Sequence, residues 1–328
     1  MPHCDLASTT AHLNRGEQLN VREKSTNCIH CNMPRVFILC FFVCVASAAP
    51  TVVQMMNWLA QLQQDWTYPR LVDIAKSIEY QGFSSDIIGR IDITGTFAGS
   101  ELNTEYVFGS LADFGTDKNT SLIGVPVNIS VSELLVQGNV MSVSLISYFN
   151  WTVDILPVQW NLLLMFNDEG QVMQYDTQLV RSSWLFPILL PKLVPRLAAE
   201  LDMPVDTDPT VLVSMRAAYD ICSKHETYCV GELQQYNSTA ECMDFITNQI
   251  PFGDIWQGSQ NTGICRYWHK AMVPLRPSEH CPHIGPSGGG MCIDRDYAQV
   301  VTEKVFPVPF IQLPGGLQVT DFSRCLGV

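Results

Sequence analysis

The feature that most constrains this chain is a cluster of six cysteines in its second half. These six are half of the twelve cysteines in the 328-residue sequence, and four of the seven histidines lie among them. The cluster consists of Cys222, Cys229, Cys242, Cys265, Cys281 and Cys292. In an oxidising compartment such a cluster forms disulfides, which stabilise a unit whose own core is small. We therefore predict three disulfides within residues 222–292, and the sequence does not select their connectivity.

The N-terminal segment predicts export. Residues 33–48 combine a positively charged start, an apolar run and a small-residue sequence that ends at Ala48. This is the pattern of a secretory signal peptide, and its apolar run is shorter than the ~20 residues that span a bilayer. We interpret residues 1–32 as an upstream leader that precedes the natural start. Cleavage after Ala48 would leave no stable membrane span.

Glycosylation signals agree with export. Four Asn-x-Ser/Thr sequons carry the acceptor asparagines Asn119, Asn128, Asn150 and Asn237. Removal of residues 1–48 leaves seven cysteines, so one thiol, Cys325, is left over or pairs back into the cluster. We therefore expect a secreted, extracellular glycoprotein with disulfide bonds.

The overall charge excludes one class of partner. The net charge is −13 at neutral pH, and charged residues make up 16% of the chain. Nucleic acids are bound through Lys and Arg patches that neutralise phosphates, so we expect no nucleic-acid partner. A hydrophobic content of 47% is enough to bury a sizeable core.

The first half carries the pattern of an α+β domain, which we place at residues 49–201. Apolar residues at helical spacing predict two opening helices, and runs rich in β-branched residues predict strands. The expected elements are helices at 51–64 and 69–82, a strand at 87–97, a short helix at 101–111, and strands at 122–131, 135–149, 158–166 and 172–179. A turn at 167–170 joins the last two strands as a hairpin. Residues 186–201, with three prolines, predict a surface connector followed by a short helix.

This order of elements resembles the SnoaL-like, nuclear transport factor 2-like fold. The last hairpin, Phe166–Asp176, has the strand, polar-glycine turn and Tyr-Asp ending that are frequent in that superfamily. The resemblance covers residues 52–184 and implies a cone-shaped antiparallel sheet with N-terminal helices around an apolar pocket. Some members use this pocket as isomerases, cyclases or dehydratases, and others only bind there. Many of the enzymes have a histidine in the pocket, whereas this chain has none between residues 49 and 224.

The pocket of such a domain offers three candidate acid–base residues, Asp92, Tyr106 and Asp176. Asp92 lies between two isoleucines on an expected strand, so it faces away from them. It is either a pocket carboxylate with a raised pKa or a solvent-facing acid. Asp176 follows Tyr175, so at most one of these two side chains enters the pocket.

The second half predicts a small helical module rich in cysteine and histidine, at residues 202–300, followed by an extended C-terminal arm at 301–328. It resembles the cysteine-rich C-terminal regions of uncharacterised secreted fungal proteins, a resemblance that implies no activity. His269 lies on an expected helix, and His280 and His283 lie on a proline-containing turn. These three histidines could hold a metal ion, or they could cap helices and stack on tryptophans.

Two classes of function stay open. The first is a protein that binds a small apolar ligand, or a partner, through the pocket. The alternative is an extracellular enzyme, either a lyase or isomerase that uses Asp92 and Tyr106, or a metal-dependent oxidoreductase that uses the three histidines. The lack of a pocket histidine in the first half favours binding. The sequence names no cofactor, no substrate and no oligomeric state.

Overall fold

A computed structural model of the chain describes residues 49–113 and 120–311. The expected leader (1–32), the signal peptide (33–48), Asn119 and Cys325 lie outside the described residues. Within these ranges, no helix is long and apolar enough to cross a membrane.

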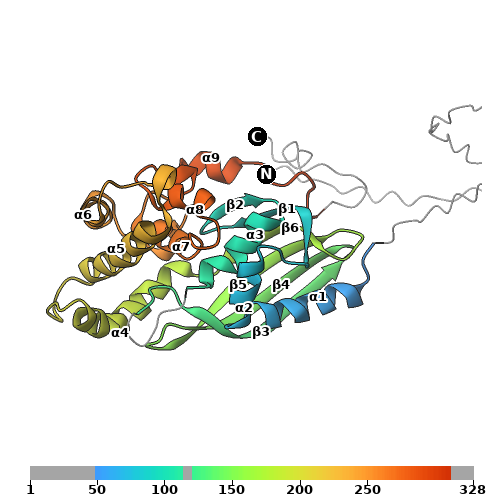
Figure 1. Cartoon of the computed structure of the whole chain (residues 1–328). Helices are drawn as coiled ribbons and strands as arrows, with labels where there is room; N and C mark the ends of the chain where they lie inside the picture. The colour runs from blue at the N-terminus through green and yellow to red at the C-terminus, as the bar shows by residue number, and fades with distance from the viewer. Residues whose placement is uncertain (1–48, 114–119, 312–328) are drawn as a thin grey trace, which may run out of the picture. The chain divides into compact units, whose positions relative to one another are not determined.

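The domain opens with helices whose ends are set by local chemistry. α1 (Val52–Asp65) begins at Thr51, whose hydroxyl accepts a hydrogen bond from Gln54 N while the Gln54 side chain accepts one from Thr51 N. This reciprocal capping satisfies backbone donors that the first helical turn leaves open. α2 (Arg70–Ser77) and α3 (Ser100–Val107) follow, and Figure 1 shows α1 to α3 on one side of the sheet.

The sheet has six strands in the order β2-β1-β6-β5-β4-β3. Their bounds are β1 (Phe83–Ile91), β2 (Gly95–Ala98), β3 (Val125–Gln137), β4 (Val140–Asn150), β5 (Ile155–Phe166) and β6 (Val172–Leu179). Four of the five neighbouring pairs are antiparallel, but β1 pairs with β6 in parallel. The expectation of an antiparallel sheet was therefore wrong for this pair. After α3 the chain crosses to β3 at the far edge of the sheet and then adds β4, β5 and β6 in turn, so that β6 lies beside β1 and runs in the same direction as β1. The cone shape stays a prediction.

Two expected strands are in fact hairpins. The strand expected at 87–97 turns back at residues 92–94, and Ile91 pairs with Gly95, which has a positive φ of 122°. The strand expected at 135–149 begins inside β3, turns at Gly138 with φ 61°, and continues as β4. The hairpin expected at 167–170 is confirmed. The alternation expected in β4 is also confirmed, with Met141, Val143 and Leu145 buried.

The second half is helical. Its helices are α4 (Leu185–Glu200), α5 (Pro209–Tyr228), α6 (Thr239–Asp244), α7 (Gly263–Lys270), α8 (Pro277–Ile284) and α9 (Tyr297–Thr302). The region expected as a connector is instead the 16-residue helix α4, with Pro191 and Pro195 inside it. Burial of Leu189, Leu193 and Leu197 at four-residue spacing provides the packing that offsets the backbone hydrogen bonds lost at proline.

Three disulfides join these helices, as the cysteine cluster predicted. They are Cys222–Cys242, Cys229–Cys281 and Cys265–Cys292. The first ties α5 to α6, the second ties the end of α5 to α8, and the third ties α7 to the segment before α9. The first two disulfides thus connect α5, α6 and α8, and the third holds α7 to the segment before α9.

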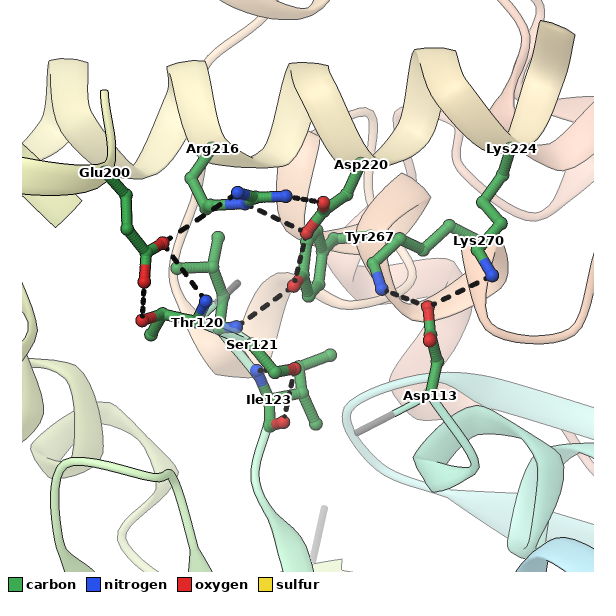
Figure 2. A network of polar contacts seen from close by, with 11 residues as sticks. Asp113, Thr120, Ser121, Ile123, Glu200, Arg216, Asp220, Lys224, Tyr267 and Lys270 are labelled. Atoms are coloured by element: carbon green, nitrogen blue, oxygen red, sulfur yellow. Dashed lines mark hydrogen bonds and ion pairs between the residues drawn. The ribbon is translucent and has the colours of Figure 1, made fainter. Parts of the chain in front are cut away.

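Polar contacts hold the helical module against the loop that enters β3 (Figure 2). The Tyr267 hydroxyl accepts a hydrogen bond from Leu122 N at 3.0 Å and donates one to Asp220 at 3.0 Å. The ammonium of Lys270, which is buried, lies 2.7 Å from the Asp113 carboxylate. α7 is therefore fixed to α5 on one side and to the sheet domain on the other.

Two further expectations concern the surface. Asn128 and Asn237 are exposed and Asn150 is half-buried, so glycosylation at these sites stays a prediction.

After α9 the chain continues without helix or strand to residue 311. Gln174 on β6 donates a hydrogen bond to Val308 O at 2.6 Å, so this segment lies along the sheet.

Candidate functional site

A cavity lies between the sheet, the N-terminal helices and the helical module. It encloses about 770 Å³ of space not filled by atoms, counted to its open mouth. Seven of its lining residues are aromatic and none carries a formal charge at neutral pH. The lining residues are Trp58, Leu62, Trp66, Phe83, Ile91, Ile93, Thr94, Tyr106, Val107, Ser110, Leu111, Leu145, Trp160, Leu162, Leu164, Tyr175, Thr177 and Trp268. Its apolar walls are those of a small-molecule site.

The helical module closes one side of this cavity through Trp268 of α7. The module reaches the β1–β2 turn because Gly258 has no side chain there. A Cβ at Gly258 would lie 2.6 Å from Ile93 O and 3.2 Å from Trp268 Nε1. Any larger residue at position 258 would push the module away from the turn.

Tyr106 lines the cavity and is hydrogen-bonded to a histidine of the module. Its hydroxyl lies 2.8 Å from His269 Nε2, and His269 Nδ1 lies 2.8 Å from Cys265 O. Because a carbonyl only accepts, Nδ1 carries the proton and Nε2 accepts from the tyrosine. Burial, then the neighbouring His283 and His280, hold the pKa of His269 well below its ordinary value, and burial raises the pKa of Tyr106. Both groups are therefore neutral at neutral pH.

The other two acid–base candidates lie outside the lining of the cavity. Asp92 lies in the β1–β2 turn, exposed on one side, and its carboxylate accepts a hydrogen bond from Leu179 N at 3.1 Å. Partial loss of hydration against β6 raises its pKa to about 6. Asp176 is paired with Arg90, Nε to Oδ1 at 2.9 Å. Strand alternation turns Tyr175 into the cavity instead, so the expectation that only one of this pair enters it holds.

The three candidate metal ligands lie close together in the module. The ring centroids of His269 and His283 are 4.7 Å apart, and those of His280 and His283 are 5.4 Å apart. Among the described residues, however, the one group of three potential ligands with donor atoms within 4.8 Å of one another is Cys265, His269 and Cys292. Both sulfurs of that group are in a disulfide. A metal site at the three histidines stays a prediction, and it would need side-chain rotation.

Glu105 anchors one of these histidines. Its carboxylate is fully buried and lies 3.1 Å from His280 Nε2. Arg276 donates two hydrogen bonds to it, at 2.6 and 2.7 Å. Burial alone would raise the pKa of Glu105, but the hydrogen bonds from His280 and Arg276 outweigh it and hold that pKa below its ordinary value. His280 and His283 lie on α8, where a turn was expected. Figure 1 shows α7 and α8 beside α3 and β2.

The sequence identified Tyr106 but missed its partner. His269 comes from 163 residues further along the chain, in a different domain. Trp268 also lines the cavity, which the sequence does not predict. Periodicity places both on one helix, but only the packing of that helix on α3 brings them to the cavity.

Two domain models of one family match this chain. The BfoA N-terminal domain matches residues 60–177, and the BfoA family C-terminal domain matches residues 181–295. The bifonsecin B biosynthesis cluster protein A of Aspergillus brasiliensis is 38% identical over 260 residues, covering 78% of this chain and 85% of that protein. The aurasperone B biosynthesis cluster protein A of Aspergillus niger is 38% identical over 260 residues, covering 78% of this chain and 83% of that protein.

Solved structures share parts of the fold. A protein from Jannaschia sp. CCS1, described as a SnoaL-like polyketide cyclase, is 11% identical with a TM-score of 0.30, covering 41% of this chain and 90% of that protein. Structural neighbours of this chain therefore include proteins of the SnoaL-like kind. The TM-score is low, so this similarity does not define the fold of the chain.

Proposed function

The chain belongs to the BfoA family, and we propose that it is a secreted glycoprotein that binds a small apolar molecule in the cavity. The observation that carries this proposal is the cavity itself, whose lining is aromatic and aliphatic and carries no formal charge. An uncharged, aromatic lining that reaches an open mouth suits a ligand that is itself apolar. The names of the relatives place them in the bifonsecin B and aurasperone B biosynthesis clusters, which supports a ligand of biosynthetic origin. Three disulfides support export.

The test uses two adjacent leucines of β5. Leu162 lines the cavity, whereas Leu163 does not and belongs to the opposite face of the strand. We expect Leu162→Trp to fill the cavity and to weaken binding of the neutral tricyclic probes fluorene and 9-fluorenone by about tenfold or more. Leu163→Trp is the matched control and is expected to bind both probes like the unaltered protein. Equilibrium dialysis measures both affinities.

Binding of neither probe to the unaltered protein, or equal binding to both variants, would contradict a ligand in this cavity.

N-terminal sequencing of the same secreted preparation checks export. A mature end directly after Ala48 is expected, and an end near His3 would contradict the signal peptide.

A second candidate function is acid–base catalysis on the bound molecule. The hydrogen bond between Tyr106 and His269 favours it, because it links a cavity-lining hydroxyl to a buried imidazole. In this proposal the Tyr106 hydroxyl is the group that contacts the reacting atom of the ligand, and His269 Nε2 orients that hydroxyl. Tyr106→Phe would then abolish conversion of a bound ligand and leave its affinity nearly unchanged. Equal loss of both would contradict a catalytic role.

A further inference from the structure

The outer face of β3, β4 and β5, which is turned away from the cavity, carries almost no charge. Strand alternation places Leu145 on the cavity side of β4 and Tyr148 on the outer face. Within these three strands, all of which the structure describes, Glu133 is the one charged residue. Large apolar side chains of this face are exposed, Leu135 by 65%, Tyr148 by 38% and Ile155 by 53%. An uncharged, partly apolar surface of this kind marks a contact site or a risk of aggregation.

The chain itself covers the neighbouring part of the outer face. The segment after α9 lies over β1 and β6, where Gln174 donates a hydrogen bond to Val308 O at 2.6 Å. The Arg90 guanidinium lies 5.3 Å from the centre of the Phe306 ring. Gln174 is buried as a result. The exposed side chains of β3, β4 and β5 show that no described segment covers that part of the face in the same way.

Two of the predicted glycan acceptors lie on the uncovered part. Asn128 of β3 is exposed and pairs directly with Tyr148 of β4, which in turn pairs with Pro157 of β5. Asn150, which is half-buried, is the next outward-facing residue of β4 after Tyr148. Side chains that pair directly have Cβ atoms about 4.5–5.5 Å apart. A sugar on the Asn128 amide would therefore begin beside the flat, apolar surface of the Tyr148 ring.

A glycan at Asn128 and a second copy of the chain could not occupy this face together. A specific interface between copies buries about 800 Å² on each partner, which is enough to take in all three strands. Such an interface would include Asn128, because this residue lies in the same row as Tyr148 and Pro157. An N-linked glycan is bulky and solubilising, so it would hold a second copy away.

We propose that an N-linked glycan on Asn128 lies against Tyr148 and shields the outer face of β3, β4 and β5 from a second copy of the chain. Without the glycan, the face is free to associate with the same face of another copy, since burial of apolar surface drives association. This inference rests on the proposed function, a secreted glycoprotein, and goes further by giving one acceptor asparagine a role.

The first measurement is glycan occupancy in the full chain secreted by a eukaryotic host. Enzymatic release of the glycan converts an occupied asparagine to aspartate, which mass spectrometry of the peptides detects. We expect Asn128 to be occupied in most chains. An occupied Asn237 together with a bare Asn128 would overturn the inference and leave export intact, because Asn237 lies on the helical module. If both are bare, the proposed glycoprotein and this inference fail together.

Variants of the sequon then test the shielding. Ser130→Ala removes the sequon and Ser130→Thr keeps it, so the two variants of this exposed residue differ in the glycan on Asn128. Sedimentation velocity measures their self-association. We expect the dimer of Ser130→Ala to be tighter than that of the unaltered glycosylated chain by about tenfold or more in Kd, and Ser130→Thr to match the unaltered chain. Asn128→Gln should behave like Ser130→Ala.

A second substitution checks that the contact is made through this face. Tyr148→Lys, added to Ser130→Ala, places a charge beside Asn128 that would be buried without a counter-charge, so self-association should fall to the level of the unaltered chain. Equal self-association of Ser130→Ala and Ser130→Thr, or association that persists with Tyr148→Lys, would overturn the inference. A dimer of the unaltered glycosylated chain that Tyr148→Lys abolishes would also overturn it, because a second copy would then cover the face.

Discussion

Replacement of both Cys229 and Cys281 by serine is expected to lower the free energy of unfolding by about 4 kcal/mol. This disulfide closes the largest loop of the three, with a sequence separation of 52 residues, and loop closure of that length stabilises by about this amount. It also ties the C-terminal end of α5 to α8, where His280 and His283 lie. Urea unfolding of the purified protein under non-reducing conditions measures the effect.

The matched control is the pair Cys222→Ser and Cys242→Ser. That disulfide has a sequence separation of only 20 residues, so the expected loss is smaller, about 3 kcal/mol. A loss below about 1 kcal/mol for the larger loop, or free thiols at these positions in the unaltered protein, would show that the disulfides do not stabilise the module.

Arg276→Met is expected to lower the free energy of unfolding by about 3–5 kcal/mol at pH 7. The substitution removes both hydrogen bonds that the guanidinium donates to Glu105 and leaves that carboxylate buried with His280 alone. In the unaltered protein the pKa of Glu105 is held below its ordinary value, so its contribution is present at neutral pH and is lost as the pH falls through that lowered pKa. That loss lies below pH 5, so the unaltered protein should keep this contribution at both pH 7 and pH 5, and urea unfolding of the variant at pH 7 measures the effect of the substitution.

The variant should respond to pH in the opposite sense. Without Arg276, burial raises the pKa of Glu105, so protonation on going from pH 7 to pH 5 relieves the buried charge and the destabilisation should shrink. The double variant Arg276→Met with Glu105→Gln is the control, because it removes the charge as well, and it should be more stable at pH 7 than Arg276→Met alone. A single variant that loses under 1 kcal/mol at pH 7 would contradict a stabilising role for this pair.

The sequence predicted best those elements that their own residues determine. α1 and β4 follow from apolar spacing, and the β5–β6 hairpin follows from the turn at 167–170. The parallel pairing of β1 with β6 was missed because partners that are distant in sequence leave no local signal. The turn at Gly138 was missed because the apolar alternation of β3 and β4 continues through it. The helix α4 was missed because its prolines obscured a regular leucine spacing.

The candidate site shows the same division. Tyr106 was identified from a pattern within one domain, whereas His269 and Trp268 join it only through the packing of α7. The first half of the chain has no histidine, yet a histidine does lie beside the cavity, because α7 brings His269 to Tyr106. Asp92 was chosen from its place between isoleucines, and the turn at 92–94 takes it out of the strand.

The measurement that tests the central claim most directly is a crystal structure of the purified chain grown with 9-fluorenone. The account predicts electron density for the three rings inside the cavity lined by Trp160, Trp268 and Leu162. Density for the probe only on the outer surface, with the cavity walls unchanged, would contradict it.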